Sequence, residues 1–271
     1  MNYLYDYSVI GGDLRQVYIA NELSASGAGV VCHGLCAPTS DTITTNSLEV
    51  AIKTARCIIC PIPFKQYDII NLLSDGQYFF AGCIPKNYVA EAISKGVKVY
   101  DLMENNSLAI YNSIATAEGA VCEAITRSPI NLHHSKCAVL GYGRCGKTLC
   151  NYLKGMFCNV SVYVNKEDSQ SYAATVCDRS GSVSDFEKQA SDFDFVFNTI
   201  PAKVVTDSAL SRMKSDVTII DIASTPGGVD YAAAAERRIN AALCLGLPGK
   251  YSPSSSAKAI INIIRSELSC L

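Results

Sequence analysis

The chain has 271 residues, a formal net charge of −2 at pH 7, 49% hydrophobic residues and 18% charged residues. This charge balance lacks the basic surface that nucleic acid or an anionic lipid surface requires, so we expect neither as a partner. The sequence has no apolar run near 18 residues, and no basic segment precedes an apolar core at its start. We therefore expect neither a membrane span nor a secretion signal, and we predict a cytoplasmic protein with enough apolar residues for two domains.

The thirteen cysteines lie mostly inside apolar runs. Their number is odd, and this distribution is typical of buried thiols in a reducing compartment rather than of disulfides. Cys57 and Cys60 have C-x-x-C spacing, but no second such pair and no suitably spaced His pair completes a tetrahedral ligand set. We therefore expect no bound metal.

Short β-rich runs alternate with helical segments in the first half of the chain. Strands are predicted near Tyr7–Ile10, Gly29–Cys32, Ala55–Cys60, Tyr78–Ala81 and Lys98–Tyr100. Helices are predicted near Leu14–Ser24, Ser47–Thr54, Tyr67–Leu73 and Lys86–Ser94. A longer helix is predicted from about Asn106 to Thr126, because apolar residues recur there at spacings of three and four.

The second half repeats this alternation. Strands are predicted near Lys136–Gly141, Val160–Val164, Phe193–Thr199, Val217–Asp221 and Ala241–Leu245, and a last helix near Ser256–Leu268. The alternation predicts an α/β fold class with two doubly wound parallel-sheet domains joined by the long helix. We expect residues 1–120 to form a flavodoxin-like substrate domain, completed by the C-terminal helix at 251–271. Residues 121–250 are expected to form a Rossmann NAD(P)-binding domain.

The segment Gly141-Tyr142-Gly143-Arg144-Cys145-Gly146 is a complete G-x-G-x-x-G between a predicted strand and a predicted helix. That is the context in which the pattern binds a dinucleotide. Gly141 allows the tight turn, Gly143 lets a diphosphate approach the backbone, and Gly146 lets the helix lie close to the strand. Loops after three later strands face the same crevice. They complete the predicted cofactor site with Thr199, Ile200, Pro201, Ala223, Ser224, Gly246 and Pro248.

Asn165 and Lys166 follow the second strand of this domain. An acid at that position accepts hydrogen bonds from the ribose 2′-hydroxyl of NAD, whereas a cation accommodates the 2′-phosphate of NADP. Because this chain has no acid at the strand end and has Lys166 nearby, we predict NADP. NAD stays the alternative, since Glu167 follows immediately. The alternative for Lys166 is a solvated lysine in a turn that binds no phosphate.

The turn Gly11-Gly12-Asp13 also follows a predicted strand but lacks the dinucleotide pattern. A carboxylate at Asp13 would repel a diphosphate. Arg15 lies in the first helical turn, and its guanidinium fits a carboxylate group bidentately. We predict that Arg15 holds a small carboxylic acid and that Asp13 accepts a proton; the alternative is a helix cap and a surface arginine.

Ser113 and Thr116 lie within about one turn of each other on the long helix, and Asn112 lies beside them. They are added to the predicted catalytic site as groups that hold the acid. The alternative is a polar helix face in water.

Six segments in this order resemble the family of dipicolinate synthase A subunits over essentially the whole chain. The segments are VIGGDLRQ, NNSLAIYNSIATAEGAV, VLGYGRCGKT, NTIPA, IDIASTPGGVDY and LGLPGKYSP. The resemblance implies two domains like those of formate, glycerate and alanine dehydrogenases, with a nicotinamide cofactor at Gly141, Gly143 and Gly146. It also implies a partner, a second small flavoprotein-like subunit, the B subunit. We further expect a homo-oligomer.

The reaction that the resemblance implies is the oxidation of dihydrodipicolinate to dipicolinate, the substrate deriving from the 4-hydroxy-tetrahydrodipicolinate of the lysine and diaminopimelate pathway. It implies a role in sporulation and a place in the mother-cell cytoplasm. The chain departs from the family pattern at Thr225, where a basic residue is expected. Lys250 is a candidate substitute.

Two other functions fit the same residues. One is an alanine-dehydrogenase-like NAD(P) oxidoreductase of a small carboxylic acid, and the other is an NAD(P)-binding protein without chemistry of its own. The D-2-hydroxyacid dehydrogenases need a cofactor-domain histidine as acid and base. This chain has only His33, His133 and His134, so that mechanism is excluded.

Overall fold

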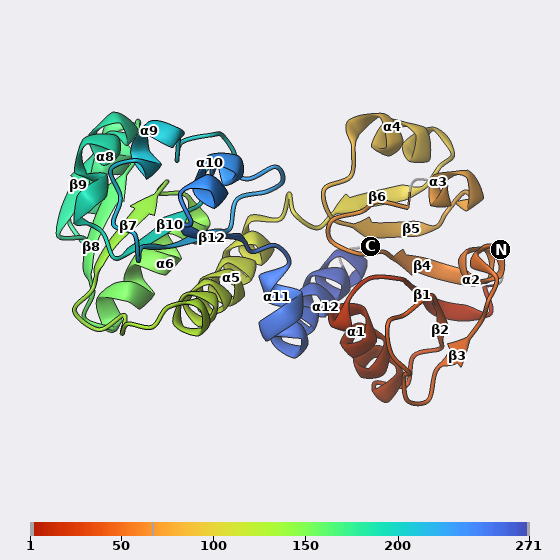
Figure 1. Cartoon of the computed structure of the whole chain (residues 1–271). Coiled ribbons are helices and arrows are strands. Elements are labelled where there is room, and N and C mark those ends of the chain that lie inside the picture. The colour runs from red at the N-terminus through yellow and green to blue at the C-terminus, as the bar shows by residue number, and fades with distance from the viewer. Residues whose placement is uncertain (1–2, 67, 270–271) are drawn as a thin grey trace. The chain divides into compact units, whose positions relative to one another are not determined.

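The computed structural model describes residues 3–66 and 68–269, and the chain divides into two compact units (Figure 1). The amino-terminal unit contains the chain up to Tyr111 and returns from Ser252 onward, and the carboxy-terminal unit spans Asn112–Tyr251. Each unit is a parallel sheet with helices on both faces. The predicted α/β class with two doubly wound domains is therefore confirmed.

The sheet of the amino-terminal unit has the strand order β3-β2-β1-β4-β5-β6, and every neighbouring pair is parallel. Without the two-residue edge strand β3, the order is that of flavodoxin-like folds. The strands are β1 (Tyr5–Ile10), β2 (Val30–His33), β3 (Ile43–Thr44), β4 (Ala55–Ile59), β5 (Tyr78–Ala81) and β6 (Lys98–Asp101).

Successive side chains of the central strands enter two different cores, because strand side chains alternate between faces. Val9 packs with α1 and α12, whereas Ile10 packs with α2, α3 and α4. Figure 1 shows α1 and α12 side by side within this unit. The helices are α1 (Leu14–Ala25), α2 (Leu48–Lys53), α3 (Ile69–Leu72), α4 (Lys86–Ser94) and α12 (Pro253–Ser269).

The sheet of the carboxy-terminal unit has the order β12-β11-β10-β7-β8-β9, which is the dinucleotide-binding order 3-2-1-4-5-6 counted from β9. All neighbouring pairs are parallel, and Cys137–Leu140 of β7 pair with Phe195–Asn198 of β10. The strands are β7 (Lys136–Leu140), β8 (Asn159–Tyr163), β9 (Arg179–Gly181), β10 (Phe195–Asn198), β11 (Thr218–Asp221) and β12 (Asn240–Leu243).

Helix α5 (Asn106–Arg127) continues from the first unit into the second. Its small residues Ala117, Ala120 and Ala124 are fully buried against β7 and β8, so its backbone approaches the sheet closely. The other helices of this unit are α6 (Arg144–Gly155), α7 (Glu167–Ala174), α8 (Val183–Gln189), the short 3₁₀ helix η1 (Ala190–Asp192), α9 (Asp207–Leu210), α10 (Tyr231–Glu236) and α11 (Leu247–Tyr251).

Three details differ from the sequence predictions. The edge strands β3 and β9 were not predicted, since each is short and lacks an apolar alternation. Helix α12 begins at Pro253 rather than near Ser256. The predicted helix Tyr67–Leu73 starts at a residue outside the described ones, and α3 covers only its later part. Among the described helices, none combines the length and apolar character that crossing a bilayer demands.

Candidate functional site

The glycine turn at residues 141–146 joins β7 to α6, and its three glycines have three different geometries. Gly141 has a φ of +94°, which only glycine adopts without strain. A Cβ at Gly146 would collide with the carbonyl oxygen of Gly141, so glycine is what lets α6 start this close to β7. A Cβ at Gly143 would meet nothing within 4 Å. The space beside Gly143 is therefore open, as a diphosphate site requires.

Gly143 is also the N-cap residue of α6, and within the described ranges 3–66 and 68–269 no side-chain hydrogen bond caps this helix start. The first N–H groups of a helix have no partner within the helix and carry its positive end. At α6 the N-cap residue is a glycine, so it offers no side chain of its own to these groups. The geometry fits an anionic diphosphate.

The three other residues of the turn take different positions. Tyr142 is buried in the core beside α6, so its backbone rather than its ring faces the turn. Arg144 is exposed, and Cys145 is half-buried. The ammonium of Lys147, one residue after the turn, lies 5.6 Å from the centre of the Tyr142 ring, a distance typical of a cation–π contact.

Asn165 and Lys166 are exposed and connect β8 to α7. The side-chain oxygen of Asn165 accepts a hydrogen bond from Val183 N at 3.2 Å, which fixes this loop against the start of α8. Lys166 is the N-cap residue of α7 and makes no side-chain cap. The strand end thus presents an amide and an ammonium, and the first acidic groups, Glu167 and Asp168, lie within α7.

The loop after β10 lies against the glycine turn. Thr199 donates its hydroxyl to Leu140 O at 2.9 Å, and its side chain fills the space where Gly141 lacks a Cβ. Ile200 contacts the same position, and Pro201 is exposed. The structure therefore brings the loop at residues 199–201 to the glycine turn.

The loop after β11 contains Ala223, which is buried, and Ser224, which is exposed. It is held by the carboxylate of Asp221, which is fully buried and accepts four hydrogen bonds. Asp221 and Asn198 are recognisable in the sequence as strand ends, but no role was predicted for either. The available signal was a charged residue directly after an apolar strand, in a position where a carboxylate is normally exposed.

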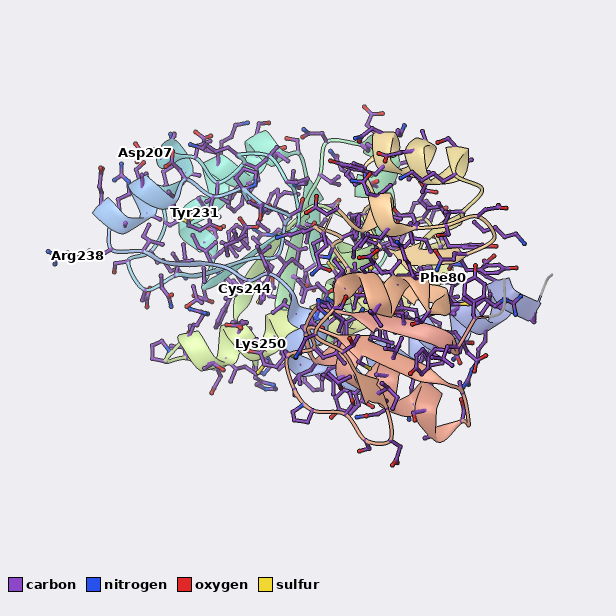
Figure 2. All side chains as sticks on the ribbon, turned by 90° about the vertical axis from the view of Figure 1, so that its right-hand side faces the viewer. Phe80, Asp207, Tyr231, Arg238, Cys244 and Lys250 are labelled. Carbon is purple, nitrogen blue, oxygen red and sulfur yellow. The ribbon has the colours of Figure 1, made fainter. Side chains whose placement is uncertain are left out.

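Gly246 has a φ of +65° and precedes the short helix α11, which contains the buried Pro248. Helix α11 is fastened to α5 by Glu123, whose side chain is only 6% exposed. Its carboxylate accepts hydrogen bonds from Lys250 Nζ at 2.5 Å, Tyr251 Oη at 2.8 Å and Arg127 Nε at 2.8 Å. Figure 2 labels Lys250 in this region. Lys250 is thus already paired inside the unit.

The pKa of Glu123 is lowered to about 2. The hydrogen bond from Lys250 is the largest cause, and the bonds from Tyr251 and Arg127 add to it, against the opposing effect of burial. In return, the bond to Glu123 raises the pKa of Lys250. Both groups therefore stay charged near neutral pH, and the pair joins α5 to α11.

The first glycine turn differs from the second. Asp13 caps α1 by accepting a hydrogen bond from Arg15 N at 3.0 Å. The Arg15 guanidinium then binds the same carboxylate bidentately, at 2.9 Å from Nε and 2.8 Å from Nη2, and also donates to Ile62 O at 2.7 Å. Arg15 is buried, so it is not a surface residue. Its guanidinium faces a carboxylate of the protein itself.

Burial raises the pKa of Asp13, but the hydrogen bonds and charge of Arg15 outweigh burial and hold that pKa below its usual value. Asp13 is therefore a weaker proton acceptor than an ordinary aspartate. The structure supports the capping alternative for Asp13, and its role as a base stays a prediction.

Ser113 and Thr116 are both buried rather than exposed to water. Ser113 Oγ lies 2.8 Å from Thr148 Oγ1, which belongs to α6, and Thr116 donates to Asn112 O at 2.8 Å. Both hydroxyls thus have partners inside the carboxy-terminal unit. Their role in holding the acid stays a prediction.

A cavity of about 560 Å³ lies in the amino-terminal unit, around the loop that follows β2. His33 lines it, and its ring nitrogen Nδ1 lies 3.0 Å from Thr45 O. The other lining residues belong to 32–39 and 44–46, and these segments contain no lysine or arginine. Among the described residues, the lining thus offers no guanidinium or ammonium group to a dicarboxylate.

Two family models match separate parts of the chain. The N-terminal domain of the dipicolinate synthase A subunit matches residues 6–69, and the NAD-binding domain of D-isomer-specific 2-hydroxyacid dehydrogenases matches residues 108–234. The dipicolinate synthase A subunit of Bacillus subtilis (strain 168) is 29% identical over 95% of this chain and 93% of its own length.

Two solved structures of dipicolinate synthase A subunits match this chain over nearly its whole length. The crystal structure of the dipicolinate synthase A subunit from Bacillus halodurans has a TM-score of 0.85 at 29% identity and covers 99% of both chains. That from Bacillus subtilis has a TM-score of 0.83 at 26% identity and covers 99% of this chain and 97% of its own. The chain is similar to the dipicolinate synthase A subunits over nearly its whole length.

These matches confirm the resemblance drawn from the sequence motifs. The carboxy-terminal unit of this A-subunit relative is an NAD-binding dehydrogenase domain, and the protein is an oxidoreductase that depends on a nicotinamide cofactor. The catalytic histidine of the 2-hydroxyacid dehydrogenases is not part of the likeness, because no histidine follows His134. The match to the 2-hydroxyacid dehydrogenases therefore concerns their nucleotide-binding domain and not their catalytic histidine.

Proposed function

We propose that the protein is the A subunit of a dipicolinate synthase, which oxidises dihydrodipicolinate with NADP. The observation that carries the proposal is the glycine turn at residues 141–146, where α6 begins without a side-chain cap and the space beside Gly143 is open. The relatives named for dipicolinate synthase support the choice of reaction. An amide and an ammonium at Asn165 and Lys166, with no acid at the strand end, support NADP over NAD.

The residues that would hold the cofactor all belong to the carboxy-terminal unit. The diphosphate would lie at the N-terminus of α6, and the 2′-phosphate near Lys166. The loops at residues 199–201 and 223–224 would line the nicotinamide side, since ligands of such sheets bind outside the carboxyl ends of the strands. When bound, the cofactor accepts the hydride that leaves a ring carbon of the substrate, and a second hydrogen leaves the ring as a proton.

The remaining task of the protein is to hold the diacid in line with the cofactor. Loss of the two hydrogens makes the pyridine ring aromatic, so the reaction needs no strongly activated base. Positioning of this kind supplies roughly 7–11 kcal/mol in well-oriented reactions. Arg15 is the proposed carboxylate-binding group of the amino-terminal unit, and the substrate carboxylate would then exchange with Asp13 on the guanidinium fork.

The proposal includes a homo-oligomeric state, a partner B subunit, and a role in the mother-cell cytoplasm during sporulation. The likeness to proteins named as one of the subunits of dipicolinate synthase supports the partner. The sporulation role and the mother-cell location are proposed from the same likeness to the dipicolinate synthase A subunits.

A single-turnover measurement tests the reaction. The purified chain is mixed with NADP and freshly prepared dihydrodipicolinate, with and without the B subunit. The absorbance of the reduced nicotinamide is followed together with the dipicolinate formed. We expect equal amounts of both products, and a faster reaction with NADP than with NAD. Failure to form either product when the B subunit is present would contradict the proposed reaction.

A further inference from the structure

Asp221 ends β11, and its carboxylate is fully buried with both oxygens saturated. Oδ1 accepts hydrogen bonds from Asn198 Nδ2 at 2.9 Å and from Ala223 N at 3.0 Å. Oδ2 accepts from Gly228 N at 2.7 Å and from Tyr231 Oη at 2.8 Å. All four donors are neutral, so the hydrogen bonds rather than an ion pair compensate for the burial of this group.

The four donors belong to different pieces of the chain. Ala223 and Gly228 lie at the two ends of the loop that follows β11, and Tyr231, labelled in Figure 2, opens α10. Asn198 ends the neighbouring strand β10. One carboxylate thus closes the loop at residues 222–228 on itself and fastens it to β10 and α10.

Asn198 extends this network to the loop after β10. Its Nδ2 also donates to Ile200 O at 3.0 Å, and its Oδ1 accepts from Ile200 N at 3.1 Å. Ile200 in turn lies against Gly141 of the glycine turn. A continuous set of contacts therefore runs from Asp221 to the turn that is proposed to bind the diphosphate.

The loop closes around Asp221 without room for larger residues. A Cβ at Gly227, whose φ is +87°, would lie 2.6 Å from Asp221 Oδ2, and a Cβ at Gly228 would lie 2.6 Å from Ile200 O. Burial and the neighbouring Asp221 raise the pKa of Tyr231, so its phenol stays a donor. The tight packing and the four donors therefore hold the backbone of this loop in one conformation.

We infer that Asp221 is a positioning residue for the nicotinamide half of the dinucleotide, which it serves by fixing the backbone at Ile200 and at Ala223-Ser224. This inference rests on the proposed function. In a sheet of this order, the adenosine half lies over β7 and β8 and the other half over β10 and β11. Asp221 thus acts on one half of the ligand through other residues, without touching the reacting atoms.

Separate ligands for the two halves test the inference. The ligands are NADPH, which spans both halves, and 2′,5′-ADP, which is confined to the adenosine half; dissociation constants come from calorimetry or fluorescence. Asp221→Asn replaces an acceptor by an NH₂ group that faces two donors, so the loop must move. We expect Asp221→Asn to weaken NADPH by roughly 10- to 30-fold and 2′,5′-ADP by less than about 2-fold, with kcat lowered.

Two further variants complete the design. Asn198→Ala frees the Ile200 loop but leaves the carboxylate in place, so it decides the question where Asp221→Asn is insoluble; we expect roughly 5-fold weaker NADPH and unchanged 2′,5′-ADP. Asp207→Asn is the matched control, because Asp207 is an exposed carboxylate of the same unit whose partner is Arg237 at 2.7 Å. Figure 2 labels Asp207 at the surface. We expect this control to change neither constant.

Equal weakening of both ligands by Asp221→Asn or Asn198→Ala would show a general loss of structure and would overturn the inference. Unchanged NADPH binding in these variants would overturn it as well. If the wild-type protein binds both ligands and the variants show this equal weakening, only the positioning role is refuted. A wild-type protein that binds neither ligand refutes the proposed function and the inference together.

Discussion

The two glycine turns of this chain each lead into a helix, and the two N-cap residues have nearly the same backbone angles but different side chains. Asp13 caps α1 with φ −96° and ψ −168°, and Gly143 caps α6 with φ −80° and ψ −163°. At the first turn, a carboxylate of the protein occupies the helix start and a buried arginine binds that carboxylate. At the second turn, the N-cap residue is a glycine and makes no side-chain cap.

This difference shows what makes a strand–turn–helix unit an anion site. Each turn is followed by a helix whose start carries the positive end of the helix dipole. At the first turn, Asp13 accepts a hydrogen bond from Arg15 N, so an incoming anion must displace this carboxylate. At the second turn, the N-cap residue Gly143 has no side chain that could take this place, which fits the proposed diphosphate site. Whether a carboxylate stands at the N-cap position is therefore more informative than the presence of glycines.

The largest effect is expected from Gly143→Asp, which places a carboxylate at the N-cap position of α6, as Asp13 does for α1. The backbone already matches that of Asp13, and the added side chain enters open space. We expect the free energy of unfolding to stay equal or rise by about 1 kcal/mol, because the helix gains a cap. Repulsion of about 4 kcal/mol between close like charges should weaken NADPH at least ~100-fold.

Fluorescence titration with NADPH and thermal unfolding measure the two effects. Gly143→Ala is the control, since it adds a Cβ without a charge, and we expect it to weaken NADPH far less than Gly143→Asp does. A Gly143→Asp protein that binds NADPH as tightly as the wild type would show that the diphosphate lies elsewhere.

A second prediction concerns Glu123, a buried carboxylate of the carboxy-terminal unit that pairs with Lys250 and Arg127. We expect Glu123→Gln to lower the free energy of unfolding by about 2 to 3 kcal/mol at pH 7, because three donors lose a charged acceptor. The folded pKa of about 2 lies below the ordinary value of 4.5. The stabilisation is thus present above the ordinary value and is lost as the pH falls toward 2.

Urea unfolding of both proteins at several pH values tests this. The difference between wild type and Glu123→Gln should shrink progressively below pH of about 5. A difference that stays constant down to low pH would mean that the Glu123 charge contributes nothing and that the variant acts through packing.

The sequence was sufficient for the features that depend on local pattern. The apolar strands, the glycine turn and the long helix follow from periodicity and from residues with special backbone freedom. The edge strands β3 and β9 were missed because residues such as Ile43 and Thr44 are exposed and pair on one side only. Their existence depends on the neighbouring strand rather than on their own composition.

The networks around the site were beyond the sequence for a related reason. Asp221 reads as a polar residue at a strand end, and its four donors are spread over residues 198–231. Ser113 and Thr148 are 35 residues apart and meet only through the packing of α5 on α6. The composition of the first turn, in contrast, suggested both possible roles of Asp13, and the geometry shows the helix cap.

A third prediction concerns the first glycine turn, where a charged side chain is removed rather than added. Arg15→Ala should lower the free energy of unfolding by about 1 to 2 kcal/mol, because the half-exposed Asp13 and the carbonyl of Ile62 lose their donor. It should leave the dissociation constant of NADPH unchanged and raise the KM for the diacid. Arg15→Lys keeps the charge but not the fork, so we expect partial rescue. An unchanged KM in Arg15→Ala would discard Arg15 as the carboxylate-binding group.

The smallest effect is expected at Lys166, in the loop between β8 and α7. This lysine is exposed and makes no side-chain cap hydrogen bond. Lys166→Ala should weaken NADP by roughly 5-fold at low salt and leave NAD unchanged, because the lysine would contact only the 2′-phosphate. The effect should fade at high ionic strength, since an exposed charge is screened. Lys188→Ala, at an exposed lysine on α8, is the matched control. Equal losses for NADP and NAD would mean that Lys166 acts through the loop rather than through the phosphate, and the open turn would then accept either dinucleotide.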